Sequence, residues 1–190
     1  MKPIFLMACL VVLALNCNAG QQAANSEQMA AKAAIKEFAG ALQMELKTAM
    51  KAGGPVAAIA VCNTQALPIS EEVSASHDMA ISRVSLKNRN SANVPNEWQK
   101  AVLEDFESQK AAGKDVKTLV WSETVSVGDV AESRFMKAIP TGAVCLACHG
   151  ENISPEVEQQ LSVLYPEDRA TGFREGDIRG AFVVTRKLSN

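Results

Sequence analysis

The chain has 190 residues, of which 47% are hydrophobic, and it carries 19 basic and 21 acidic side chains. This length is typical of one domain with a substantial core, since a chain of this size buries roughly two-thirds of its surface. The formal charge of −2 argues against a nucleic-acid-binding protein, which needs a basic face. The unusual counts are five cysteines and only two histidines, so their positions are the best guide to chemistry.

The N-terminus is typical of a secretory signal peptide over residues 1–19. Lys2 is its positive charge, residues 4–15 form an apolar run, and small residues precede a cut after Ala19. The run of twelve residues is shorter than the about 20 that span a bilayer, which favours cleavage over an uncleaved anchor. The mature chain is therefore expected in the periplasm or another exported compartment, with no stable membrane span.

The first predicted elements of the mature chain are helices. A flexible, polar lead-in covers residues 20–28, after which residues 29–51 carry apolar side chains at three- and four-residue steps. That spacing predicts an amphipathic helix, and a Gly-Gly pair ends it. Residues 56–62 are apolar all round, which predicts a buried helix that ends at Pro68.

Strand patterns dominate the rest of the predicted domain, which runs over residues 29–190. Asn96 and Gln99 resemble a capping box at the start of a helix that Gly113 ends. A shorter helix opens at Pro155. Helices followed by an antiparallel sheet indicate an α+β fold. The expected strands cover residues 79–86, 116–127, 131–139 and 181–188.

The strongest motif is Cys-Leu-Ala-Cys-His at residues 145–149. Its spacing is that of a c-type haem attachment sequence. Cys145 and Cys148 lie one helical turn apart, which suits the two vinyl groups of one porphyrin edge, and His149 then supplies an imidazole to the iron. A redox Cys-x-x-Cys pair would not need the histidine, and a zinc site would need a fourth ligand.

The second axial ligand is open at this point. In small electron carriers a downstream methionine closes the site, but the 41 residues after His149 contain neither Met nor His. Cys62 stands out because Ala58 and Ala66 flank it on its helix and leave a flat surface, although a buried inert thiol is as common. His77 fits a surface loop, and Met136 is a second choice. The other candidates are Met29, Met44, Met50 and Met79, of which Met44 and Met50 fit gap-filling core positions.

Four separate blocks of the sequence resemble a known family. It comprises exported single-haem c-type proteins with a PAS-like fold, known from cyanobacteria and from the sensor regions of bacterial receptors and kinases. The resemblance implies an antiparallel sheet with a long N-terminal helix, and His149 and Cys62 as axial ligands of one covalent haem c. Many relatives carry a membrane segment and a transmitter domain, which this chain lacks, so signalling would need a separate partner. The blocks are residues 58–62, 85–98, 145–150 and 172–182.

The expected function is a redox or small-gas sensor. A thiolate ligand favours ferric iron and a low potential, and its release on reduction would open the iron to a small diatomic ligand. The alternative is a low-potential electron-transfer cytochrome that meets a redox partner protein. A haem enzyme acting on small sulfur compounds is less favoured, because no acid, base or second metal is apparent, and no catalytic residue is assigned.

Four basic residues are candidates for binding the haem propionates, since bidentate arginines suit carboxylates. Lys87 and Arg89 follow a predicted strand, and Arg174 and Arg179 lie in a glycine-rich loop. A solvated loop face is the alternative for each of them. The long N-terminal helix could also pair two copies into a homodimer.

Overall fold

The computed structural model describes residues 8–188. The start of the predicted signal peptide, residues 1–7, and the last two residues of the predicted domain lie outside the described residues. Three short 3-10 turns cover Ser91–Asn93, Val116–Thr118 and Ala143–Cys145. The helices are α1 (Ala8–Thr64), α2 (Ala66–His77), α3 (Glu97–Ala111), α4 (Leu146–His149) and α5 (Pro155–Leu164), and the strands are β1 (Ala80–Val84), β2 (Val120–Val127), β3 (Val130–Pro140) and β4 (Ile178–Leu188).

Helix α1 consists of two helices joined at a kink. Gly53 (φ −153°, ψ 20°) and Gly54 (φ 68°, ψ −161°) leave the helical region, and the positive φ of Gly54 is one that glycine adopts without a steric penalty. The predicted Gly-Gly break is therefore confirmed. Across residues 8–188, no helical stretch combines the length and the apolar character that a bilayer crossing requires.

Two expectations about the helices are wrong. Residues 20–28, expected as a flexible lead-in, are helical and continue into the rest of α1, because Gln, Ala and Glu are good helix formers. Pro68 does not end a helix but lies in the first turn of α2, where a missing N–H costs no hydrogen bond. His77, expected in a surface loop, is consequently the last residue of α2.

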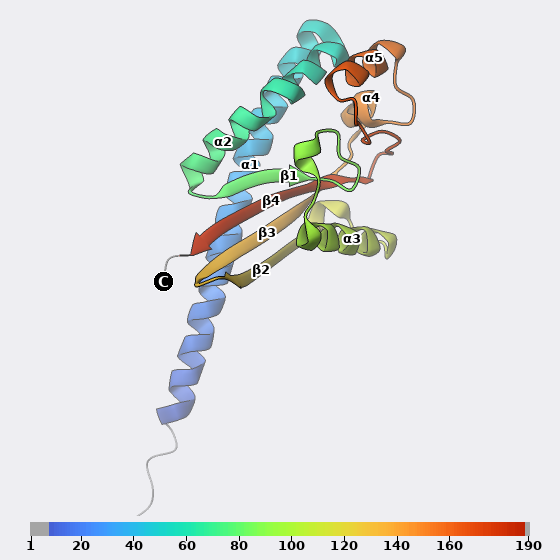
Figure 1. The fold of residues 1–190 in the computed structure, drawn as a ribbon. Helices are drawn as coiled ribbons and strands as arrows, with labels where there is room; N and C mark the ends of the chain where they lie inside the picture. The colour runs from blue at the N-terminus through green and yellow to red at the C-terminus, as the bar shows by residue number, and fades with distance from the viewer. Residues whose placement is uncertain (1–7, 189–190) are drawn as a thin grey trace, which may run out of the picture.

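The four strands form one antiparallel sheet in the order β1-β4-β3-β2 (Figure 1). All four predicted strands are present, and the capping box of Asn96 and Gln99 opens α3 as expected. The strand predicted from residue 116 begins only at Val120, because Val116–Thr118 form a 3-10 turn that the Asp115 side chain caps. Strand β4 begins at Ile178, three residues earlier than predicted. The predicted α+β class and the PAS-like arrangement, with a long N-terminal helix beside an antiparallel sheet, are confirmed.

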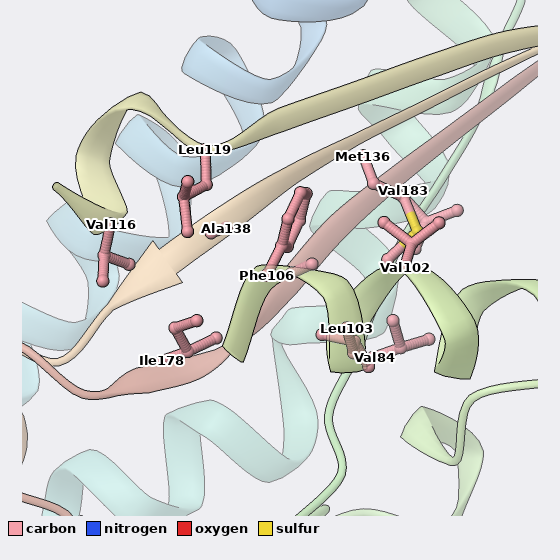
Figure 2. Close-up of a cluster of buried hydrophobic side chains, with 11 residues drawn as sticks. Val84, Val102, Leu103, Phe106, Val116, Leu119, Met136, Ala138, Ile178 and Val183 are labelled. Carbon is pink, nitrogen blue, oxygen red and sulfur yellow. The ribbon is translucent and has the colours of Figure 1, made fainter. Parts of the chain in front are cut away.

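Helices cover both faces of the sheet (Figure 1). On one face Phe106 of α3 is fully buried against Met136 and Val183 of the strands (Figure 2). On the other face Phe38 of α1 packs with Phe135. These opposite directions follow from the two-residue period of side chains along a strand. The α3 cluster also contains Val84, Val102, Leu103, Val116, Leu119, Ala138, Ile178 and Ala181, and the α1 cluster Ala31, Ala34, Ile35, Val73, Met79, Ile81 and Val184.

Candidate functional site

The face of the sheet that packs against α1 is hollowed at one end. The hollow measures about 1240 Å³ when its open mouth is counted. It lies where α1, the sheet and the segment around α4 meet. Its lining includes Leu42, Leu46, Met50, Ala58, Ile59, Cys62, Arg83, Asn88, Arg89, Ile139, Val144, Cys145, Cys148, His149, Tyr165, Arg179, Gly180 and Phe182.

The strand residues reach this cavity because of register and side-chain alternation. Arg83 on β1 pairs with Phe182 on β4, and Gly180 pairs with Ile139 on β3. Residues two apart on a strand share a face, so Phe182 lies on the same face as Val184 of the α1 cluster. At Gly180 a Cβ atom would collide with the carbonyl oxygen of Val84, and glycine is therefore required where β4 passes β1.

The Cys-Leu-Ala-Cys-His segment forms a turn of 3-10 helix followed by α4. Cys145 and Cys148 have free, half-buried thiols, and so does Cys62 near the end of α1. Cys148 packs against the α5 cluster, which contains Ile59 of α1. The structure thus brings Cys62, which is more than 80 residues away in the sequence, to the same cavity as the two motif cysteines and His149.

The ring of His149 is fixed by a backbone carbonyl. Its Nδ1 lies 2.7 Å from the carbonyl oxygen of Ala170. A carbonyl oxygen only accepts, so Nδ1 carries the proton and Nε2 keeps its lone pair. Burial, helped by the positive charges of Arg179 and Arg89, lowers the pKa of His149 to about 2. The imidazole is therefore neutral at physiological pH, which is the form that binds metals.

The backbone around His149 is held by hydrogen bonds on both sides. The N–H of Phe173 donates to the carbonyl of His149 over 2.9 Å, and the N–H of Gly172 donates to the carbonyl of Gly150 over 2.9 Å. The N–H of Gly150 donates to the carbonyl of Leu146 over 3.0 Å and closes α4. These bonds tie the motif to the loop that leads into β4.

Three arginines give the cavity a strong positive charge. Arg83 lies over the ring of Phe38, 5.5 Å from its centre. Arg179 donates from Nη1 to the Ser85 hydroxyl and the Lys87 carbonyl, while its buried Nε finds no acceptor within the described part of the chain. Burial, together with the charges of Arg89 and Arg83, lowers the pKa of Arg179 to about 10. The arrangement favours an anionic ligand, because buried charges need partners.

Arg89 differs from the other two because protein groups accept hydrogen bonds from both its Nε and its Nη2. Its Nε lies 3.0 Å from Asp168 Oδ2, and its Nη2 donates to the carbonyls of Cys148 (2.6 Å) and Ala170 (3.2 Å). Burial raises the pKa of the Cys148 thiol, and the charge of Arg89 opposes that rise. Burial likewise raises the pKa of Cys62, against the charges of Arg83, Arg89 and Arg179.

Two of the four basic candidates lie away from the cavity lining. Lys87 donates from Nζ to the Thr171 carbonyl over 3.2 Å and lines a neighbouring hollow beside α3. Arg174 forms an exposed ion pair with Glu151, with 2.8 Å between Nη2 and Oε1. Arg89 and Arg179 line the cavity itself.

The structure also separates the candidate axial ligands. Cys62 and Met50 line the cavity. Met136 is fully buried in the α3 cluster on the other face of the sheet, and Met79 is buried in the α1 cluster. Met29 and Met44 are exposed, so the expected core position of Met44 is wrong. His77 Nε2 lies 2.9 Å from Glu37 Oε2.

Sequence reasoning missed Arg83 and Tyr165. Arg83 interrupts the apolar strand pattern at a position that shares a face with Ile81. A charged residue on the inward face of a strand is a signal that could have found it. Tyr165 is the single tyrosine of the chain and closes α5 against Ile59, but its sequence context carried no comparable signal.

Comparisons with known proteins found one matching family and one similar solved structure. A family model described as "Tll0287-like: Tll0287" matches residues 18–186. The crystal structure of the cyanobacterial haem protein Tll0287 is similar, with a TM-score of 0.51 and 27% identity over 65% of this chain and 72% of that chain. No curated protein sequence matches significantly. The family match therefore includes Cys62, the 145–149 motif and the sheet except for the last two residues of β4.

Proposed function

The chain belongs to the Tll0287-like family, and from this premise we propose that it is an exported c-type haem protein that holds one covalent haem. The observation that carries the proposal is the shared lining of one cavity by Cys145, Cys148, His149 and Cys62. Two thiols at this spacing followed by an imidazole form the donor set of haem c. The relative Tll0287 is described as a haem protein, which supports the same ligand here.

Each donor has a distinct proposed role. Cys145 and Cys148 would form thioether bonds to the porphyrin, and His149 would bind the iron through Nε2, since Nδ1 donates to Ala170. Cys62 would be the second axial ligand. Arg179, whose Nε has no acceptor among residues 8–188, and Arg83 would face the propionates, because guanidinium groups suit carboxylates. When bound, haem supplies a one-electron Fe(III)/Fe(II) couple and, if one axial position opens, a site for a diatomic ligand.

The test is covalent attachment in a host with c-type maturation. The exported wild-type protein should keep haem through denaturing electrophoresis, since thioether bonds survive unfolding. Cys145→Ala combined with Cys148→Ala should release it. Cys62→Ser is the matched cysteine control and should keep the attachment. Haem that washes out of the denatured wild type would contradict the proposal.

We propose a redox or small-gas sensor as the role of this haem. Two breaks bound the segment that carries Cys62: the Gly53-Gly54 kink before it and the junction with α2 after it. Ile59 of that segment packs against α5, and α1 also contacts α4 and α2, of which α2 contacts β1. A change at Cys62 would therefore reach the outer helices and the sheet edge. Reduced protein should bind CO with a change of axial ligand, and an unchanged six-coordinate spectrum would refute the role.

Low-potential electron transfer is the second candidate. Val144, next to Cys145 and at the cavity lining, is 65% exposed, so a haem edge held there would meet solvent and a redox partner. Reversible cycling without a ligand change would favour this role over sensing.

We propose that the protein is exported and that its signal peptide is cleaved. Cleavage after Ala19 would leave α1 to begin at Gly20, and N-terminal sequencing of the exported protein tests this.

We also propose that two copies pair through the N-terminal part of α1, where Met29 is 71% exposed. This pairing would make a homodimer, and sedimentation of the purified protein measures its molecular mass.

A further inference from the structure

We infer that Arg89 and Asp168 form a positioning pair that sets the orientation of the His149 ring. This inference rests on the proposed function, since His149 is the proposed iron ligand. The pair lies between the loop after β1 and the loop before β4, two segments that are 79 residues apart. Both side chains are nearly buried, at 9% and 11% exposure.

The contacts converge on one carbonyl. Ala170 O accepts from His149 Nδ1 over 2.7 Å and from Arg89 Nη2 over 3.2 Å. Asp168 holds the same residue from its other side, because its Oδ1 accepts from the N–H of Ala170 over 2.8 Å. Both backbone groups of Ala170, its N–H and its C=O, are therefore hydrogen-bonded to the pair, and the direction of the C=O sets the orientation of the imidazole that donates to it.

The same guanidinium also holds the attachment motif. Arg89 Nη2 donates to the carbonyl of Cys148 over 2.6 Å, and the charge of the guanidinium strengthens this hydrogen bond. A second hydrogen bond, from the N–H of Arg169 to the carbonyl of Asn88 over 3.0 Å, joins the same two loops. One arginine thus fixes the second motif cysteine and the acceptor of the histidine ring together.

The arrangement has an electronic consequence. A cation on Ala170 O competes with His149 Nδ1–H for that oxygen and limits the imidazolate character of the ring. Loss of Arg89 would make the ring a stronger donor and more free to rotate. Lysine could not replace it, because one ammonium group lacks the planar fork that reaches a carboxylate and two carbonyls at once.

The experiment compares variants of the haem-loaded full chain. The variants are Arg89→Lys, Arg89→Gln, Asp168→Asn and the double variant Arg89→Gln/Asp168→Asn. The control is Arg174→Gln, which removes the exposed ion pair with Glu151 in the same region. The readouts are the electron paramagnetic resonance of the oxidised protein and its reduction potential.

A pair that positions the His149 ring and a pair that acts only through its charge predict different spectra and potentials for these variants. For positioning, Arg89→Lys and Asp168→Asn both split or broaden the single low-spin signal, the double variant adds nothing to either single change, and Arg174→Gln resembles wild type. If only charge mattered, Arg89→Lys would resemble wild type, and Asp168→Asn would raise the potential while keeping the single wild-type signal, which would overturn the inference. Variants that melt earlier but keep the wild-type signal would also overturn it.

A variant or a wild-type protein that is recovered without haem also gives an interpretable result. If Arg89→Gln is recovered without haem, the inference stands when Asp168→Asn gives the split signal and falls when it does not. A wild-type protein without covalent haem would refute the proposed function. A loaded wild type with unaffected variants would refute only the positioning pair.

Discussion

Replacing Gly150 with alanine tests how tightly the turn after His149 is closed. The backbone of Gly150 (φ −70°, ψ −178°) suits any residue, so alanine adds no backbone strain. Its Cβ would, however, lie 2.6 Å from the Leu146 carbonyl oxygen, which also accepts the N–H of Gly150. The blocking atom belongs to the backbone, and it can move only if α4 opens.

The expected change in the free energy of unfolding of Gly150→Ala is the sum of two opposing effects. Overpacking at a closed contact costs about 1–3 kcal/mol, and alanine returns about 0.4–1 kcal/mol by restricting the unfolded chain. The expected loss is about 1–2 kcal/mol, which lowers the melting temperature by about 2–8 °C for a chain of this size. The shifted turn should also change the absorption spectrum of bound haem, because His149 precedes it.

The assay compares Gly150→Ala with Gly142→Ala in thermal and urea unfolding. Gly142 lies on the other side of the same motif, has negative φ, and leaves the space around an added Cβ open within 4 Å. Its alanine variant should match wild type or gain about 0.4–1 kcal/mol. Equal stability and equal spectra for the two variants would refute the close contact at Gly150.

Three other predictions concern the rest of the fold. Phe106→Ala should cost about 3–5 kcal/mol in urea unfolding yet keep the haem spectrum, because Phe106 packs on the face of the sheet away from the cavity; a loss below about 1 kcal/mol would contradict the buried contact. Asn96→Ala should cost about 1 kcal/mol by removing the cap of α3, and unchanged urea midpoints would argue against the capping box. The third prediction concerns Asp177. Burial alone would raise the pKa of Asp177, but hydrogen bonds from Lys110 Nζ and the Arg174 N–H hold this pKa below its usual range. The stabilisation by the Asp177 carboxylate is complete above the unfolded carboxyl pKa of about 4 and is lost as the pH falls through the lower pKa of the folded state. The difference in free energy of unfolding between wild type and Asp177→Asn should therefore narrow below about pH 4. A difference that does not change with pH would refute this role of Asp177.

Local signals predicted most of the fold correctly. The strands, the capping box at Asn96 and the Gly-Gly break each depend on residues close together in sequence. The wrong predictions concern residues that are compatible with two kinds of local structure. Pro68 suits both a helix end and a first turn, and the choice depended on how α2 packs onto β1. Gly180 resembled a loop residue, but it lies inside β4 because the strand passes close to the Val84 carbonyl.

The site was predictable in part. The spacing of residues 145–149 marks the attachment motif by itself, since its chemistry is local. Cys62 was one of several candidate ligands, and its place in the cavity depends on how α1 packs against α4 and α5. The role of Arg89 could not be inferred from sequence, because its partners Asp168 and Ala170 come from a loop that only the folded sheet brings near.

The most direct test of the central claim is the electron paramagnetic resonance spectrum of the oxidised protein with and without Cys62. The wild type should give a low-spin signal typical of thiolate and imidazole ligation, and Cys62→Ser should lose it while the haem stays covalently bound. The matched variant Met50→Leu, at the other candidate donor in the cavity lining, should keep the wild-type signal. An identical spectrum for wild type and Cys62→Ser would contradict the claim that Cys62 and His149 hold one iron between them.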